Sequence, residues 1–404
     1  MPLANRDLMR AMNRSTILNI IKVYGPIARV DVAHRSGLSP ATVTGITGDL
    51  IEEDLIYEKE AGDTTTAGRK PILLAINPSG RYVIGVKLTE TKVIGALTDL
   101  EASMIVKKTD ELSEYSAQGV VKQISLLVGE LLALAKLPKK KLLGIGVGLA
   151  GIVDSEHGIL RQSPYRDWHD LPLRDMLQEQ VRVPVYIDND VNTLTLAEKW
   201  FGAGEGVEDF LIVTVGRGIG MGIVVNGQFY RGANGGAGEF GHTIVDPEGP
   251  QCECGRQGCL EAYAGDHGLL RMAREAVAKG ELPGPVESTG ELLELAKAGD
   301  AKAQAIYAEA GKRLGLGIAN LINVFNPEKV IISGEGTCVG DLMFEPMRKT
   351  INNCVMSGFL QDTEIQIDDW GDDDWAHGAA SLVLLELFES PVNSKQELQT
   401  RIPK

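Results

Sequence analysis

The residues whose types and spacing most clearly indicate a metal-binding site lie in the stretch GHTIVDPEGPQCECGRQGCLEAY, residues 241–263. His242, Cys252, Cys254 and Cys259 form the pattern Hx9CxCx4C, with glycines that permit tight turns between the cysteines. Imidazole nitrogen and thiolate sulfur are ligands that a tetrahedral Zn²⁺ prefers, and four protein ligands close its coordination sphere. The pattern therefore predicts a structural Zn²⁺. The alternative is a loop of reduced cysteines with a histidine of the core nearby.

Carboxylates lie on both sides of this pattern. Glu239 precedes His242 by three residues, and Glu261 follows the last cysteine by two. A loop tied by a metal would hold these two carboxylates and the imidazole near one point. The stretch VYIDNDVN places Asn189 and Asp190 directly after an expected strand, where α/β folds expose ligand-binding groups. Amide and carboxylate groups suit the hydroxyls of a sugar, so we expect a sugar site.

Length and composition limit the class of protein that positions these residues. The chain has 404 residues, so we expect two or three compact domains. Residues 1–16 contain no apolar signal segment, and no run reaches the roughly 18 apolar residues that span a bilayer. We therefore expect a cytoplasmic protein without a membrane partner. Cys338 and Cys354 lie far from the other cysteines, which is typical of a reducing compartment with one metal site.

The charge is unevenly distributed along the chain. The formal net charge is −15, but residues 1–80 hold nine Lys and Arg against nine Asp and Glu. The whole excess of acid therefore lies beyond residue 80. Within the balanced segment, Arg6, Arg10, Arg14 and Lys22 face only Asp7 before residue 24, so they are candidates for contacts with DNA phosphates.

Residues 1–76 are predicted to form a winged helix-turn-helix. An apolar stripe at residues 17–24 indicates a first helix, which Gly25-Pro26 ends. The stretch RVDVAHRS indicates a second helix, which ends at Gly37 because glycine adopts the left-handed cap easily. Ser39 as N-cap and Pro40 as first residue open a third helix.

The outward face of the third helix is small and carries hydroxyl groups. We expect it to contact DNA through Ser39, Ala41, Thr42 and Thr44. Gly45 and Gly48 lie on the same face, and each costs a helix interior about 1 kcal/mol, which a close approach to the major groove would explain. The following stretch alternates like two strands of a wing, whose Arg69 or Lys70 we expect at the minor groove or the phosphates. The alternative is a three-helix packing module with an ordinary hairpin.

Beyond residue 77 the pattern changes to strands and glycine turns. RYVIGVKLTETKVIGALTD and SMIVKKTDEL indicate three adjacent strands, AQGVVKQISLLVGELLALAK a helix, and KLLGIGVGLAGIVD another strand. A similar order recurs in DFLIVTVGRGIGMGIVVNGQFYRG, GKRLGLGIANLINVFN and EKVIISGEG. The repetition predicts two α/β halves with a cleft between them.

Five motifs occur in one order: GLAGIVD, DNDVN, VGRGIGMGI, the stretch from Gly241 to Glu261, and NPEKVIISGEG. In this order they resemble the ROK family of sugar kinases and sugar-responsive repressors, and the resemblance covers essentially the whole chain. With the predicted winged head in front, the chain is similar to the repressor branch. The resemblance implies an α/β protein with a winged helix-turn-helix at 1–76 and a two-lobed, actin-like (ribonuclease H-like) region. Its lobes would span 77–200 and 201–404, with a C-terminal helix that can return to the first lobe.

The resemblance also implies roles for single residues. It implies sugar contacts from Gly151, Asn189, Asp190, Glu239, His242 and Glu261. His242 would bind zinc through its other ring nitrogen. In a kinase of this family Asp190 would be the catalytic base that takes the proton from a sugar hydroxyl.

The chain departs from the kinase pattern at its phosphate loops. Kinases of the family begin the first lobe with a DxGGT loop, and the matching place here reads GVKLTETK. Lys87 replaces the aspartate, and residues 88–90 put bulky side chains and Glu90 where backbone N–H groups would bind phosphate. Arg217 enlarges the second glycine turn, and Glu335 enters a turn that is usually all glycine. YRDWHDLPL stands where kinases often carry Asn before Trp. We therefore expect no enzyme activity.

Three functions are compatible with these residues. The favoured one is a sugar-responsive transcriptional repressor, a homodimer or tetramer whose heads bind the half-sites of a palindromic double-stranded operator. Sugar would change the relative placement of the heads by binding one conformation better than the other. The second is an ATP-dependent sugar kinase with a DNA-binding head. The third is a corepressor scaffold that binds a phosphotransferase partner in place of a free sugar.

Overall fold

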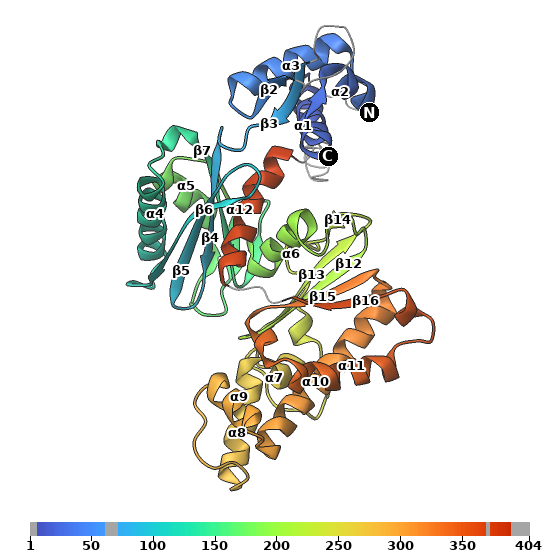
Figure 1. Ribbon diagram of the computed structural model, residues 1–404. Coiled ribbons are helices and arrows are strands. Elements are labelled where there is room, and N and C mark those ends of the chain that lie inside the picture. Colours follow the sequence, from blue (N-terminus) through green and yellow to red (C-terminus); the bar gives the residue numbers. More distant parts are fainter. Residues whose placement is uncertain (1–5, 61–71, 369–371, 389–404) are drawn as a thin grey trace, which may run out of the picture. The chain divides into compact units, whose positions relative to one another are not determined.

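The computed structural model describes residues 6–60, 72–368 and 372–388 (Figure 1). For residues 372–377 it describes the backbone alone. The chain divides into two compact units. Unit 1 contains Met1–Leu149, Ser155–Asp188 and Ala376–Lys404, and unit 2 contains Ala150–Asp154 and Asn189–Trp375. The boundaries between the two units, at residues 188 and 375, differ from the expected domain boundaries at residues 76 and 200. The division into three domains stays a prediction.

The head of unit 1 has a winged helix-turn-helix fold. It consists of α1 (Arg6–Tyr24), β1 (Ile27–Ala28), α2 (Arg29–Ser36), α3 (Pro40–Glu52), β2 (Ile56–Glu60) and β3 (Ile72–Ile76). Gly37 ends α2 in the left-handed conformation with φ 69°, and the Ser39 side chain caps α3 by accepting the backbone N–H of Thr42. The strands form an antiparallel sheet in the order β1-β3-β2, with Ile17, Ile21, Val43 and Leu50 in the core.

The larger sheet of unit 1 has the strand order β11-β7-β4-β5-β6. Its strands are β4 (Tyr82–Leu88), β5 (Lys92–Thr98), β6 (Met104–Glu111), β7 (Leu142–Leu149) and β11 (Val185–Asn189). Its helices are η1 (Lys139–Lys141), α4 (Ala117–Leu134), α5 (Leu173–Val181) and α12 (Asp372–Phe388), and β9 (Ile159–Gln162) pairs with β10 (His169–Leu171). As expected, β4, β5 and β6 are adjacent, and the structure shows that their pairing is antiparallel.

Two glycine positions show that α4 and α12 cover opposite faces of this sheet. A Cβ at Gly95 would contact Leu127 and Leu131 of α4, whereas a Cβ at Gly146 would lie 1.8 Å from the carbonyl oxygen of Ala379 in α12. Gly95 and Gly146 belong to neighbouring register rows, whose side chains point to opposite faces. Among the described helices α4 alone is long and apolar enough to cross a membrane, but half of it is buried against this sheet.

Unit 2 repeats the strand arrangement with the order β14-β13-β12-β15-β16. Its strands are β8 (Ile152–Asp154), β12 (Phe210–Val215), β13 (Ile219–Val225), β14 (Gln228–Phe229), β15 (Lys329–Ser333) and β16 (Glu364–Ile367). Its helices are α6 (Asp190–Phe201), η2 (Phe240–His242), α7 (Glu261–Ala264), α8 (Asp266–Ala278), α9 (Thr289–Lys297), α10 (Ala301–Phe325), η3 (Glu335–Val339), α11 (Asp341–Cys354) and η4 (Phe359–Gln361). One face packs on α6 through Leu194, and the other on α10 and α11 through a larger apolar core.

The two sheets share one topology. In each, the first strand in sequence pairs antiparallel with the second and parallel with the fourth, as β4 does with β5 and β7, and β12 with β13 and β15. The protein therefore has the predicted α/β architecture, a winged head followed by a duplicated actin-like region.

Candidate functional site

The four predicted metal ligands lie together in unit 2. The ligand atoms of His242, Cys252, Cys254 and Cys259 all lie within 4.8 Å of one another. The Sγ atoms of Cys254 and Cys259 are 3.7 Å apart, and Sγ of Cys252 is 3.7 Å from Nδ1 of His242. These separations match the edge of about 3.8 Å of a tetrahedron with Zn–S bonds of about 2.3 Å. The arrangement fits a tetrahedral metal ion held by three sulfurs and one nitrogen.

The local charges favour thiolate at one of these cysteines. Although partial burial opposes it, hydrogen bonds from the backbone and side chain of Arg256 lower the pKa of Cys254 to about 6. Burial raises the pKa of Cys252 to about 12. A bound cation would offset that desolvation, because a metal ligates the thiolate form. Arg256 is a neighbour that the pattern of ligands did not identify.

A carboxylate lies near each ring nitrogen of His242. Nδ1 of His242 faces the cysteines, whereas Nε2 lies 3.9 Å from the Glu239 carboxylate. Burial, together with the negative charges of Glu261 and Asp190, raises the pKa of Glu239, and His242 opposes this. An acidic group in this setting can accept a hydrogen bond from a hydroxyl or, when protonated, donate one. The orientation of His242 is the one expected of a residue that binds metal through one nitrogen and ligand through the other.

Glu261 connects the cysteine cluster to the glycine turn between β12 and β13. Its Oε2 accepts the backbone N–H of Ile219 at 3.0 Å, and its Oε1 lies 3.9 Å from Nδ1 of His242. A second link runs from the turn to the cluster, because the Arg217 guanidinium donates to the Glu253 carboxylate at 2.8 Å. The expected sugar ligand Glu261 is therefore also a structural residue of this turn.

Asn189 and Gly151 are joined directly. The Asn189 side chain caps α6 by accepting the backbone N–H of Val191 at 2.8 Å, and its Nδ2 donates to the carbonyl oxygen of Gly151 at 2.9 Å. Gly151 has φ 126°, a backbone conformation that favours glycine. Asp190 is the first residue of α6, and its negative charge contributes to the raised pKa of Glu239. All six expected sugar contacts thus lie in unit 2, where Asn189 contacts Gly151, His242 lies near Glu239 and Glu261, and the charge of Asp190 acts on Glu239.

The tight turn at 88–92 of unit 1 offers carbonyl groups where a phosphate loop offers N–H groups. The Thr89 backbone N–H is bonded to the Lys92 carbonyl oxygen at 2.9 Å. The carbonyl oxygens of Thr89 and Glu90 accept from the Arg166 guanidinium at 3.0 and 2.8 Å. Arg166 also lies over the Trp168 ring, 5.0 Å from its centroid. Sequence reasoning noted the unusual YRDW stretch but missed this role, because the partners are 76 and 77 residues apart.

Carboxylates also occupy the second glycine turn. Glu335 lies so close to Gly216 that its Oε2 would be 2.7 Å from an added Cβ. The backbone N–H of Asp266 donates to the Gly216 carbonyl oxygen at 3.0 Å, and burial together with Glu335 raises the pKa of Asp266. Two carboxylates beside this turn repel a phosphate.

The expected DNA-contact face of α3 is open. Ser39, Ala41 and Thr44 are exposed, Thr42 is half-buried, and a Cβ added at Gly45 or Gly48 would meet nothing within 4 Å. The Ser39 hydroxyl lies 2.8 Å from that of Thr42, and the Thr44 hydroxyl donates to the Pro40 carbonyl. Arg69 and Lys70 lie outside the described residues.

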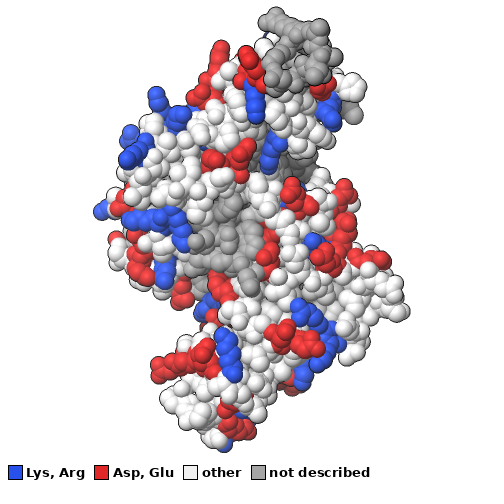
Figure 2. Space-filling model, in the orientation of Figure 1, with Lys and Arg blue, Asp and Glu red and all other residues white. Residues whose placement is uncertain are grey.

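Two of the expected phosphate contacts are engaged within the head. Arg10 forms a salt bridge with Asp49 at 2.6 Å, and Arg14 forms a bidentate salt bridge with Glu53 at 2.7 and 2.5 Å. These pairs fix α1 to the C-terminal half of α3, so Arg10 and Arg14 have protein partners. Over the face drawn in Figure 2, Lys and Arg among the described residues are interspersed with Asp and Glu.

Sequence comparison relates the chain to regulators. The ROK family model matches residues 83–386. The chain is 30% identical to the xylose repressor of Caldicellulosiruptor bescii, over 96% of this chain and 99% of that protein. It is 31% identical to the DNA-binding transcriptional dual regulator NagC of Escherichia coli K12, over 88% of each.

Structural comparison includes both regulators and kinases. A ROK family transcriptional regulator, a homologue of the E. coli Mlc protein, matches with a TM-score of 0.85 and 28% identity, over 95% of this chain and 97% of that one. A ROK family glucokinase from Streptomyces griseus, solved with glucose and AMPPNP, matches with a TM-score of 0.65 and 30% identity, over 74% of this chain and 98% of its own. The match to the regulator extends over nearly the whole chain.

Proposed function

Because the chain belongs to the ROK family, we propose that it is a sugar-responsive transcriptional repressor of carbohydrate-utilisation genes. The observation that carries the proposal is the winged head, with its open α3 face, in one chain with the polar group around His242. The similarity to a xylose repressor and to NagC over most of the chain supports it.

The proposed effector is a sugar bound in unit 2. Gly151, Asn189, Asp190, Glu239, His242 and Glu261 would contact its hydroxyls. Glu239 and Asp190 would accept hydrogen bonds, and Nε2 of His242 is the ring nitrogen that points away from the cysteines. Three carboxylates in one group favour a neutral polyhydroxylated ligand over an anion.

The proposed metal is a structural Zn²⁺ held by His242, Cys252, Cys254 and Cys259. When bound, it would fix the loop that carries these residues and so the positions of Glu239 and Glu261. Four protein ligands leave no open coordination position for catalysis.

Kinase activity is not part of the proposal. The Arg166 guanidinium binds the backbone carbonyl groups of the turn at 88–92. Asp266 and Glu335 lie beside the glycine turn at Gly216. Asp190 would then accept a hydrogen bond from a sugar hydroxyl, and the hydroxyl would keep its proton.

The repressor would be a cytoplasmic homodimer, or a tetramer, on a palindromic operator. Ser39, Ala41, Thr42 and Thr44 of α3 would contact base edges in the major groove. Arg69 and Lys70 of the wing would contact the minor groove or phosphates. Sugar would release the operator by binding one conformation better than the other.

Capture of genomic DNA tests the proposal directly. The purified full chain would be incubated with fragmented DNA of its source organism, and the retained DNA sequenced with and without each of a panel of sugars. We expect one palindrome to be enriched and one sugar to reduce its retention. Enrichment of no sequence under any condition would contradict the DNA-binding role, and unchanged retention with every sugar would contradict the sugar response.

A variant pair assigns the response to the site. Glu239→Gln should abolish the effect of the sugar while leaving operator capture intact, because Glu239 lies in unit 2 and the DNA-contact face in unit 1. Glu275→Gln, which changes an exposed carboxylate paired with Arg271 on α8, is the matched control.

A further inference from the structure

The head is bonded to the rest of unit 1 at the end of α3. Arg81, which precedes β4, donates through Nε to the carbonyl oxygen of Glu53 at 2.9 Å and through a terminal nitrogen to that of Lys140 at 2.7 Å. Glu53 is the C-cap residue of α3, and Lys140 lies in η1, which leads into β7. The last carbonyls of a helix lack partners within the helix, so they are natural acceptors for a guanidinium. One side chain therefore joins the DNA-contact helix to the central sheet.

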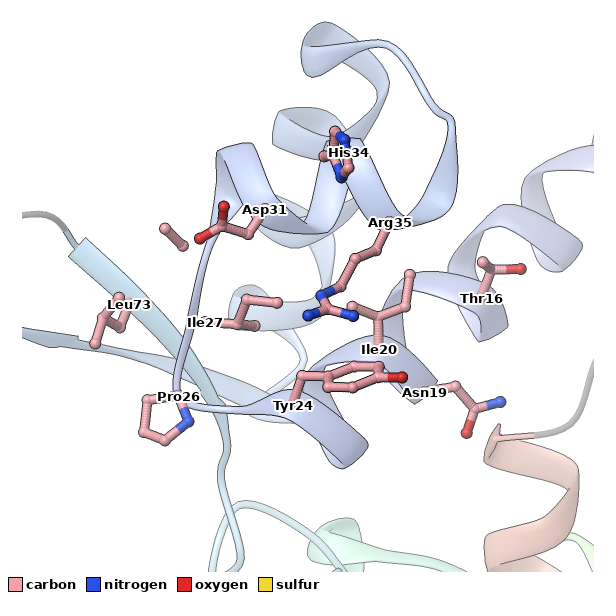
Figure 3. Close-up of a pocket in the computed structure, with 11 residues that line it drawn as sticks. Thr16, Asn19, Ile20, Tyr24, Pro26, Ile27, Asp31, His34, Arg35 and Leu73 are labelled. Atoms are coloured by element: carbon pink, nitrogen blue, oxygen red, sulfur yellow. The ribbon is translucent and has the colours of Figure 1, made fainter.

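A second bond joins α1 to α12. The Asn19 side chain donates through Nδ2 to the carbonyl oxygen of Phe388, the last described residue of α12, at 2.5 Å. Nζ of Lys22 lies 4.9 Å from the centroid of the buried Phe388 ring. Asn19 is one of the residues that line a cavity of about 1070 Å³ between α1, α2 and β3, and Figure 3 shows it beside the end of α12. The head is thus held at two separate helices, α1 and α3.

The helix that holds α1 is itself packed tightly on the sheet. A Cβ at Gly146 would lie 1.8 Å from the Ala379 carbonyl oxygen, and a Cβ at Gly144 would lie 3.3 Å from Val383. The backbones of β7 and α12 are therefore in direct contact. The chain passes from unit 2 to unit 1 between Trp375 and Ala376, inside α12. A single helix thus runs from the limit between the units to the contact with α1.

We propose that Asn19 and Arg81 are positioning residues that fix the DNA-binding head on unit 1, so that its orientation is set by the sheet and by α12. The inference rests on the proposed DNA-binding function and adds how the head is controlled. A head on a flexible tether would reach half-sites at many separations, because a tether adapts to the span. A head held by two bonded helices presents α3 at one orientation, so a dimer would accept one half-site spacing. A change at the 375–376 limit would reach the head through α12.

Operator spacing is the readout that a merely structural role would not change. The palindrome obtained by genomic capture would be compared with versions carrying 2 or about 5 extra base pairs at its centre, the latter being half a helical turn. The variants are Asn19→Asp, which keeps the size of the side chain but removes the donor, Arg81→Ala, and their combination. Arg81→Lys retains a single donor group and serves if Arg81→Ala fails to fold.

The matched control is Asn323→Asp. Asn323 also donates through Nδ2 to a carbonyl oxygen at the end of a helix, that of Cys354, but this bond lies within unit 2. Asn323→Asp should therefore preserve the spacing preference of the wild type. Thermal melts of all variants would show whether the head and sheets remain folded.

The wild type is expected to lose at least about tenfold in affinity on the lengthened operators, whereas the double variant should differ less than about threefold between spacings. Affinity for a single half-site should be unchanged, and the sugar should no longer shift operator affinity although the sugar still binds by calorimetry. A double variant that keeps the wild-type spacing preference and sugar response would overturn the inference. A wild type that enriches no operator would instead refute the proposed function.

Discussion

One carboxylate oxygen of Glu261 accepts the backbone N–H of Ile219 at 3.0 Å, so the loop that carries the cysteines is bonded to the glycine turn at the start of β13. The other oxygen lies 3.9 Å from Nδ1 of His242. Glu261 is therefore at once a candidate sugar contact and a link between the metal cluster and the central sheet of unit 2. Because of this double role, we expect the candidate metal cluster and the candidate sugar site to be interdependent.

Glu261→Gln should weaken sugar binding more than it weakens the fold. The amide oxygen can still accept the Ile219 N–H, but the negative charge is lost, and a charge-assisted hydrogen bond contributes about 1.5–3 kcal/mol, roughly tenfold or more in affinity. Calorimetric titration with the sugar identified by operator release gives the affinity, and thermal melts give the stability. A variant that binds sugar as tightly as the wild type would remove Glu261 from the site.

Metal removal should destabilise unit 2. We expect about one zinc per chain, and a lower melting temperature after dialysis against a strong chelator, because metal binding at a structural site contributes directly to folding. Cys254→Ser should lose the metal. Cys338→Ser, which changes an exposed cysteine outside the cluster, should retain it. Equal metal content in the two variants would show that the cluster is not the site.

Gly45→Ala should stabilise the protein and yet weaken operator binding. An added Cβ at Gly45 meets nothing within 4 Å, and Ala is favoured over Gly in a helix by about 1 kcal/mol. If the α3 backbone approaches the major groove closely, the same methyl group collides with DNA. Gly129→Ala, in the exposed and equally open position of α4, should give the stabilisation alone. Identical operator affinity in both variants would show that the DNA does not come close to Gly45.

The chain should not bind or hydrolyse ATP. At about 1 mM ATP with Mg²⁺, the upper end of usual KM values, we expect no change in melting temperature and no sugar-dependent ADP. The physical reasons are the Arg166 bonds to the 89–90 carbonyl groups and the carboxylates beside Gly216. Sugar-dependent ADP that disappears in Asp190→Asn would establish the kinase alternative.

Asp266→Asn should raise stability at neutral pH and have a smaller effect in acid. Burial, then Glu335, raises the pKa of Asp266 above its ordinary value of 3.8, so the fold favours the protonated form. Its favourable contribution is complete below pH 3.8 and is lost as pH rises through the folded-state value. Between pH 4 and pH 8, the melting temperature of the variant minus that of the wild type should increase with pH. Asp341→Asn, also in the first turn of a helix, controls for loss of a helix-terminal charge.

Local features were predictable because neighbouring residues decide them. The caps of α2 and α3, the limits of α2, and the grouping of the cysteines with His242 follow from turn chemistry and short spacing. The repeated strand order was also readable, because hydrophobic alternation is set within a few residues. Four candidate sugar contacts, Asn189, Asp190, Glu239 and Glu261, came from residue types and spacing. The resemblance added Gly151 and the sugar contact of His242, and all six lie in unit 2.

Partners distant in sequence were decided by the tertiary structure alone. The pairing of Arg10 and Arg14 with α3, of Arg166 with the 89–90 turn, and of Asn19 with the end of α12 join residues 39 to 369 positions apart. No local preference favours such a pair, since any of the 40 lysines and arginines could meet any exposed carbonyl or carboxylate. Packing of the sheets and helices selects the partner by bringing the two groups within hydrogen-bond distance. The sequence by itself therefore determined the candidate ligands of the site and the class of the head, whereas the fold determined which arginines are engaged in ion pairs and how the head is held.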